Sequence, residues 1–213
     1  MSDRTTEGAG TSPKRGSYAK GVAKREETLT RALEVIAREG YRGASVKELA
    51  DAVGLSQAGL LHYFNSKEEL FTEILRKRDE QDSLAAGLDI NAAPDHADMR
   101  DGFLTIIRHN ADVPGLVQLF ARLSVDAADP QHPAHRFFTE RNTLLRSVFA
   151  EHIARSQQQG TLTDRIDPDT LARVFQAVAD GLQVQFMLDP DLDMAAVVAA
   201  LFDALGTPSG DQR

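Results

Sequence analysis

Apolar residues recur at helical spacing along most of the chain. In the first such run, Leu29, Leu33 and Ile36 follow one another at intervals of four and three residues, and the run stops at Gly40. Such intervals place side chains on one face of an α-helix, and glycine commonly ends one. No stretch alternates β-branched and polar residues as a half-buried strand would, and no repeat or sustained heptad is present. The pattern predicts an all-α fold.

Serine residues mark the starts of three shorter helices after the first one. The predicted pairs of cap and helix are Ser45 with 46–53, Ser56 with 57–63, and Ser66 with a helix that reaches about residue 84. Glu48 and Glu69 each follow a capping serine by three residues, which is the spacing of a capping box. Gly54 ends the first of the three. Four helices are therefore predicted between residue 22 and about residue 84.

Five more helices are predicted in the second part of the chain, where segments rich in Pro, Gly and Asp separate helical stripes. They lie near residues 97–111, 114–128, 133–158, 168–188 and 193–206. The fourth of these has the clearest start, because Asp167 can act as the N-cap and Pro168 stands at the first helical position. About nine helices result.

Charge is distributed unevenly along the 213 residues. Residues 1–78 hold 14 Lys and Arg against 11 Asp and Glu, a net charge of +3. Residues 79–213 hold 10 against 21, a net charge of −11, and the two parts sum to the −8 of the whole chain. A cationic front part is suited to a polyanion, although a chance gradient on a solvated surface gives the same totals.

The helices predicted at 46–53 and 57–63 are separated by three residues that include a glycine, which is the spacing of a helix-turn-helix. On a helical wheel Leu60 and Phe64 point one way, whereas Ala58, Leu61 and His62 point the other way. The outward side chains are small or form hydrogen bonds, as a helix in the major groove requires. Spacing alone leaves a purely structural helical hairpin as an equal alternative.

The stretch TLTRALEVIAREGYRGASVKELADAVGLSQAGLLHYFNSKEELFTEIL strongly resembles the N-terminal DNA-binding region of TetR/AcrR-type transcriptional repressors. The motifs that carry the resemblance are the segment ELADAVGLS and the ending HYFNSKEEL. The rest of the chain is similar to the family in its all-helical layout, and DPDTLARVFQAVADGLQVQFMLDPD looks like its last helix pair. The resemblance implies a homodimeric repressor that binds a palindromic operator in double-stranded DNA and is released by a small-molecule effector.

The resemblance also assigns roles to residues of the helix-turn-helix. Ser45 and Lys67 would hold phosphates, while Tyr63 and His62 would contact backbone or bases. The predicted DNA-binding residues are Ser45, Ser56, Gln57, Ala58, Gly59, Leu61, His62, Tyr63 and Lys67. Two positions depart from the family: where Leu61 stands the family often has Tyr, and where Gly59 stands it often has Thr or Ser. For Tyr63, the alternative to a DNA contact is a half-buried aromatic side chain in the core. The predicted division is a flexible basic arm at 1–21, a DNA-binding domain at 22–68, a ligand-binding and dimerisation domain at 69–206 and a flexible tail at 207–213.

A single helix-turn-helix reads few base pairs, so two must be coupled at a fixed separation. The last two predicted helices carry apolar stripes that could pack against a second copy as a four-helix bundle. The predicted interface residues are Phe175, Val178, Gly181, Leu182, Val197, Leu201 and Leu205. For Gly181, an ordinary contact within one chain is the alternative.

An effector pocket is predicted among the helices near 97–111, 114–128 and 133–158, because polar residues lie there within apolar stripes. Asn110, Arg141 and His152 are the predicted polar anchors, and an arginine anchor would favour an acidic effector. The predicted walls are Phe103, Ile107, Leu119, Phe120, Leu123, Leu145 and Val148. The alternatives are that Arg141 pairs with Asp126 or a loop and that His152 bonds a carbonyl group.

Other chemistry finds little support in the sequence. The chain has no Cys, no P-loop and no pair of Glu-x-x-His motifs, so no catalytic residue, metal or cofactor is predicted. His132 and His135 are the nearest approach to a metal pair, but no third ligand follows them. A helical-bundle enzyme and a helical adaptor without a DNA role stay open as alternatives. Because no run approaches 18 apolar residues, we expect a cytoplasmic protein without a membrane partner.

Overall fold

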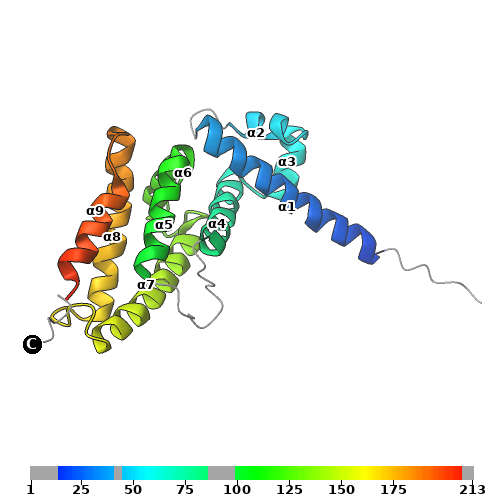
Figure 1. Cartoon of the computed structure of the whole chain (residues 1–213). Coiled ribbons are helices and arrows are strands. Elements are labelled where there is room, and N and C mark those ends of the chain that lie inside the picture. Colours follow the sequence, from blue (N-terminus) through cyan, green and yellow to red (C-terminus); the bar gives the residue numbers. More distant parts are fainter. Residues whose placement is uncertain (1–13, 41–44, 86–98, 208–213) are drawn as a thin grey trace, which may run out of the picture.

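The computed structural model describes residues 14–40, 45–85 and 99–207, with side chains from Lys20 onward. Nine α-helices and no named strand lie in these residues, which confirms the all-α prediction. The helices are α1 (Lys14–Glu39), α2 (Val46–Ala52), α3 (Gln57–Tyr63), α4 (Lys67–Ala85), α5 (Met99–Asp112), α6 (Pro114–Asp126), α7 (His135–Gln158), α8 (Pro168–Leu188) and α9 (Met194–Leu205). In Figure 1, α2 and α3 lie beside α1 at one end of the molecule, and α8 and α9 lie at the opposite end.

The capping box before α2 is present in full. The Ser45 hydroxyl accepts from the Glu48 backbone N–H at 3.2 Å, and the Glu48 carboxylate accepts from the Ser45 backbone N–H at 2.7 Å. These bonds to Ser45 hold the pKa of Glu48 below its ordinary value. The box predicted before α4 is only half right. Ser66 accepts from the Glu69 N–H at 3.0 Å, but the Glu69 carboxylate reaches the backbone and side chain of Asn65 instead of the Ser66 N–H.

The start of α1 differs from the prediction. We predicted a flexible arm at residues 1–21, yet the structure places Lys14 and the residues after it in α1. The first buried side chains of this helix are Thr28 and Leu29, so its N-terminal turns run beyond the packed part of the molecule (Figure 1). Adding residues to a helix that has already formed costs little, because nucleation is the unfavourable step. Residues 1–13 and 208–213, predicted as parts of the arm and tail, lie outside the described residues.

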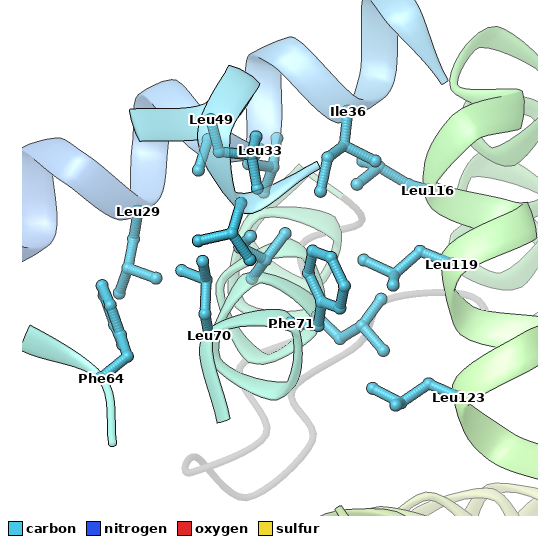
Figure 2. Packing of buried hydrophobic residues seen from close by; sticks show 14 of the residues in the cluster. Leu29, Leu33, Ile36, Leu49, Phe64, Leu70, Phe71, Leu116, Leu119 and Leu123 are labelled. Atoms are coloured by element: carbon cyan, nitrogen blue, oxygen red, sulfur yellow. The ribbon is translucent and has the colours of Figure 1, made fainter. Parts of the chain in front are cut away.

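The buried apolar residues form two separate clusters. The first joins α1, α2, α3 and α4 to α6 and the first turn of α7, and the second joins α5, α8 and α9 to the C-terminal part of α7. Figure 2 shows the first cluster, in which Leu33 and Ile36 of α1 lie on one side and Leu116, Leu119 and Leu123 of α6 on the other. The core of the N-terminal helices therefore continues into α6 and does not end at residue 68.

Candidate functional site

The turn between α2 and α3 is built around Gly54. Its φ of +70° lies in the left-handed region, where a side chain would be strained. The Leu55 N–H then donates to the Ala50 carbonyl oxygen at 2.8 Å, which closes the end of α2. The next helix begins at once, because the Ser56 hydroxyl accepts from the Gly59 N–H at 3.0 Å. This is the compact helix-turn-helix that the spacing predicted.

The two faces of α3 separate largely as predicted. Leu60 and Phe64 are fully buried, and the guanidinium of Arg25 covers the Phe64 ring at 4.8 Å from its centroid. The exposed residues of the helix are Gln57, Ala58 and His62. Since the buried face anchors a helix of only seven residues, the exposed face is presented in a fixed orientation.

Leu61 and Tyr63 do not point fully outward from α3. Both are half-buried and pack against the first hydrophobic cluster, so each has a structural role whatever else it contacts. The Tyr63 ring also lies edge-on to that of His62, with centroids 6.1 Å apart.

The absence of a side chain at Gly59 is explained by the cap of α3. A Cβ there would lie 3.1 Å from the Ser56 hydroxyl oxygen, so glycine leaves the cap undistorted.

Cations flank α3 at two helix starts. Lys67 is the first residue of α4 and is exposed, with its ammonium 5.3 Å from the centroid of the Phe71 ring. Lys47, in the first turn of α2, is also exposed. Sequence reasoning missed Lys47, although its place two residues after a capping serine was a usable signal. Lys24 and Arg25 of α1 are instead engaged by the acidic residues Glu27 and Glu73, at 3.2 and 2.6 Å.

A second polar group lies in the interior, around Arg78 of α4. Its guanidinium donates to the side-chain oxygen of Asn110 and, at 3.4 Å, to the carbonyl oxygen of Leu116. Its Nε lies 3.4 Å from the Asp82 carboxylate, whose other oxygen is 3.5 Å from His109 Nε2. Burial lowers the pKa of Arg78 and raises that of Asp82, because a charge loses solvation inside the protein. Asn110, a predicted pocket anchor, is therefore already bonded within the chain.

Arg141, another predicted pocket anchor, is also bonded within the chain. Its Nε and Nη2 donate to the two carboxylate oxygens of Asp79 in α4, at 2.7 and 3.0 Å. The guanidinium also lies 4.9 Å from the centroid of the Phe120 ring. Burial opposes its charge, but Asp79 and then Asp180 of α8 outweigh burial and raise the pKa of Arg141. The partner is thus Asp79, and not the Asp126 considered from the sequence.

The remaining predicted pocket residues are divided between the two clusters. Leu119, Phe120 and Leu123 belong to the first, whereas Phe103 and Ile107 belong to the second. Leu145, Val148 and His152 of α7 are half-buried. The Nε2 atom of His152 is buried without a hydrogen-bond partner in the described part of the chain, and burial lowers the pKa of its ring. A ligand-binding role for these residues stays a prediction.

The predicted interface residues of α8 and α9 fall into two sets. Phe175 and Leu182 are buried in the second cluster of their own chain, which corrects the prediction that they face a partner. Of the others, Val197 is exposed and Gly181 is half-buried, whereas Val178, Leu201 and Leu205 are half-buried against the second cluster. A Cβ on Gly181 would meet nothing within 4 Å, so no other part of the described chain requires glycine at this position. Sequence reasoning missed Val184 and Leu188, which are exposed on α8.

The two histidines that resemble a metal pair bond to the backbone instead. The His132 ring nitrogen Nδ1 accepts from the Ala134 N–H at 3.2 Å, and His135 Nδ1 lies 2.8 Å from the Ala127 carbonyl oxygen. Among the described residues, no three His, Asp or Glu side chains are placed to hold a metal ion. No described helix is long and apolar enough to cross a membrane.

Two family descriptions match the chain. The bacterial regulatory proteins of the tetR family match residues 29–74, which contain the helix-turn-helix. The C-terminal domain of BetI-type transcriptional repressors matches residues 117–207, from α6 to the end of α9. The two matches thus cover the N-terminal helices and most of the helical body.

Relatives of similar length carry the same description. The HTH-type transcriptional repressor Rv1474c of Mycobacterium tuberculosis is 25% identical over 184 residues, which are 85% of this chain and 92% of that protein. The HTH-type transcriptional repressor AcnR of Corynebacterium diphtheriae is 27% identical over 171 residues, which are 80% of this chain and 84% of that protein. These relatives are named as transcriptional repressors and not as enzymes.

Solved structures share the fold. A putative TetR-family regulator from Rhodococcus sp. superposes with a TM-score of 0.65 at 18% identity, covering 87% of this chain and all of that chain. A putative transcriptional regulator from Saccharomonospora viridis, solved in complex with choline, gives 0.63 at 21% identity over 88% of this chain and all of that one. With its helix-turn-helix at residues 46–63 and this helical body, the chain belongs to the TetR family and is a DNA-binding transcriptional regulator.

Proposed function

We propose that the protein is a homodimeric repressor that binds a palindromic operator through α3 and leaves it when a small-molecule effector binds. The observation that carries the proposal is the exposed face of α3, where Gln57, Ala58 and His62 are small or able to form hydrogen bonds and none is a long charged side chain. Such a face can approach the edges of base pairs, and glutamine can form two hydrogen bonds with adenine. Exposed Lys47 and Lys67, in the first turns of the helices before and after α3, are available for phosphates.

The backbone supports phosphate contacts at the same face. The helices α2 and α3 both begin at serine caps, Ser45 and Ser56, whose hydroxyls accept from the backbone and retain their own proton for donation. Helix N-termini favour anions, because their free N–H groups point outward. Relatives of this chain are named as repressors, which supports repression over activation. The proposed site of action is the cytoplasm, where the operator lies.

Dimerisation is proposed through α8 and α9. Apolar or small residues that are exposed or half-buried follow each other along α8 at helical spacing: Val174, Val178, Gly181, Val184 and Leu188. Val197, Leu201 and Leu205 continue this face on α9 at intervals of four residues. Two such helix pairs form a four-helix bundle about a two-fold axis, which fixes the separation of the two α3 helices. The two half-sites of such an operator lie one helical turn of DNA apart, about 34 to 36 Å, or a multiple of this distance.

An effector is proposed to act on α4. This helix starts at Lys67 beside α3 and carries Arg78, Asp79 and Asp82, which bond to α5, α6 and α7. A ligand that changes those bonds therefore changes the position of the helix that follows the DNA-binding face. The structural neighbour from Saccharomonospora viridis was solved with choline, which supports a small molecule as the effector class.

Selection of bound sequences from random double-stranded oligonucleotides tests the proposal. We expect a motif with two-fold symmetry, bound by one dimer, and we expect Gln57→Ala to lose preference at one position in each half-site. Gln158→Ala is the matched control, because Gln158 is an exposed glutamine at the far end of α7. No enriched sequence, or a motif without two-fold symmetry, would overturn the proposal.

A further inference from the structure

The Arg141 side chain is held as a bound organic cation would be. Asp79 accepts two hydrogen bonds from one edge of the guanidinium, at 2.7 and 3.0 Å, and the Phe120 ring covers its face at 4.9 Å from the centroid. Carboxylate pairing combined with an aromatic face is the usual means by which proteins bind guanidinium and quaternary ammonium groups. The three residues come from α4, α6 and α7, so the arrangement exists only in the folded body.

Two further carboxylates act on Arg141 through their charge, and one of them, Asp82, is already paired with Arg78 at 3.4 Å. The other, Asp180 of α8, accepts no hydrogen bond in the described part of the chain. Asp82 is 6% exposed, its charge also acts on Arg141, and its Oδ1 has no hydrogen-bond partner among the described residues. Three carboxylates, Asp79, Asp82 and Asp180, thus face two guanidinium groups, those of Arg78 and Arg141. The half-exposed His109 adds a third cation only when it is protonated.

We propose that Asp79, Asp180 and Phe120 form the receptor for the effector's positive charge, that the effector is a small organic cation, and that Arg141 occupies the receptor when no effector is bound. The inference rests on the proposed effector response and names its chemical class. Exchanging one cation for another keeps Asp79 and Asp180 neutralised, whereas an acidic ligand would add charge to a group already rich in carboxylates. The sequence suggested an acidic effector because Arg141 could bind it. Since Arg141 is paired with Asp79, it no longer favours an acidic effector.

Arg141 is able to leave the receptor. Its side chain is 21% exposed and has four rotatable bonds, so it can reach solvent without a change in the α7 backbone. Its departure breaks the ion pair between α4 and α7, which are the helices of Asp79 and Arg141. Effector binding and the release of α4 are then one event, since the Asp79 carboxylate cannot pair with both cations at once.

Arg141→Ala tests the receptor without DNA. We expect a lower thermal unfolding midpoint than in the parent protein, because Asp79 and Asp180 lose their counter-charge. We expect methylguanidinium chloride at millimolar concentration to raise that midpoint saturably, and more than sodium chloride does at equal ionic strength. The parent protein should need at least about tenfold more methylguanidinium for the same effect, since its own arginine competes.

The control is Arg146→Ala on the same helix, which removes a 2.9 Å ion pair with Asp169 at the surface. Its midpoint should respond equally to the two salts. The inference is overturned if methylguanidinium does not exceed sodium chloride on Arg141→Ala, or if Arg146→Ala responds in the same way. A rise of the parent midpoint with sodium glutarate, a dicarboxylate, would also overturn it.

A second measurement applies if Arg141→Ala does not fold. Titration calorimetry of the parent protein with tetramethylammonium should give saturable binding, weakened about tenfold by Asp180→Asn. Absence of binding, or unchanged affinity in Asp180→Asn, overturns the inference. None of these readouts uses an operator, so a protein that binds the cations but no DNA would refute the proposed function and leave the receptor standing.

Discussion

A Cβ atom on Gly115 would lie 2.0 Å from the carbonyl oxygen of Ile36 and 2.7 Å from the Cα of Gly40. The first turn of α6 therefore rests on the last turn of α1 with no side chain between them. Figure 2 shows the side chains of Ile36 and Leu116 packed together. Because α1 belongs to the DNA-binding end and α6 to the body, the contact fixes how one sits on the other.

Gly115→Ala should destabilise the protein, because the methyl group must push two backbones apart. Overpacking of this kind typically costs about 1 to 3 kcal/mol. Urea unfolding measures the change. Gly21→Ala is the control, since a Cβ at this helical glycine meets nothing within 4 Å. It should leave stability unchanged or raise it by up to about 1 kcal/mol. Equal stability of Gly115→Ala and the parent protein would show that the contact is not tight.

Val178→Glu and Val197→Glu should each yield monomers, because a charge buried between two copies of α8 and α9 would lack a partner. Such a charge costs several kcal/mol, on the order of 3 to 5. Sedimentation velocity measures the association. Val125→Glu is the control, since Val125 is 72% exposed on α6, a helix that is not part of the proposed interface. Two glutamate variants that remain dimers would move the interface to another face.

Lys67→Ala should weaken binding to all DNA sequences and reduce the slope of log affinity against log salt by roughly one. Fluorescence anisotropy at several salt concentrations gives this slope. Lys77→Ala, in the same helix, should leave the slope unchanged, because Lys77 is paired with Glu26 and Glu80 at 3.2 Å. If the two variants have the same slope as the parent protein, Lys67 does not contact phosphate.

Asp180→Asn should raise stability at neutral pH. Burial, only partly offset by Arg141, raises the pKa of Asp180 above its ordinary value of 3.8. A carboxyl group with a raised folded-state pKa favours the folded state when protonated, so the parent protein loses stability as pH rises through this range. Asparagine resembles the protonated form and avoids that loss.

Urea titrations across the acidic range measure the difference, which should narrow toward pH 3.8 and disappear below it. Asp164→Asn, at an exposed position in the loop after α7, is the control for removing one charge from the chain. A variant of Asp180 that is less stable than the parent protein at neutral pH would mean that its attraction to Arg141 outweighs burial.

The sequence by itself determined the local features. Ser45 with Glu48, Ser56, and Asp167 with Pro168 mark helix starts that the structure confirms, because a cap bonds to residues only two or three positions away. Gly54 likewise ends α2, because the turn needs a positive φ. The inward face of α3 followed from Leu60 and Phe64, since one face of that helix is apolar and the other is not.

Only the tertiary structure decided which groups meet across the chain. Asp79 and Arg141 are 62 positions apart, and no periodicity relates α4 to α7. The helix α8 carries apolar residues on more than one face, so the pattern did not reveal that Phe175 and Leu182 turn inward while Val184 and Leu188 turn outward. Packing chose between these faces, because α6, α7 and α9 pack against α8 and leave Val184 and Leu188 at the surface.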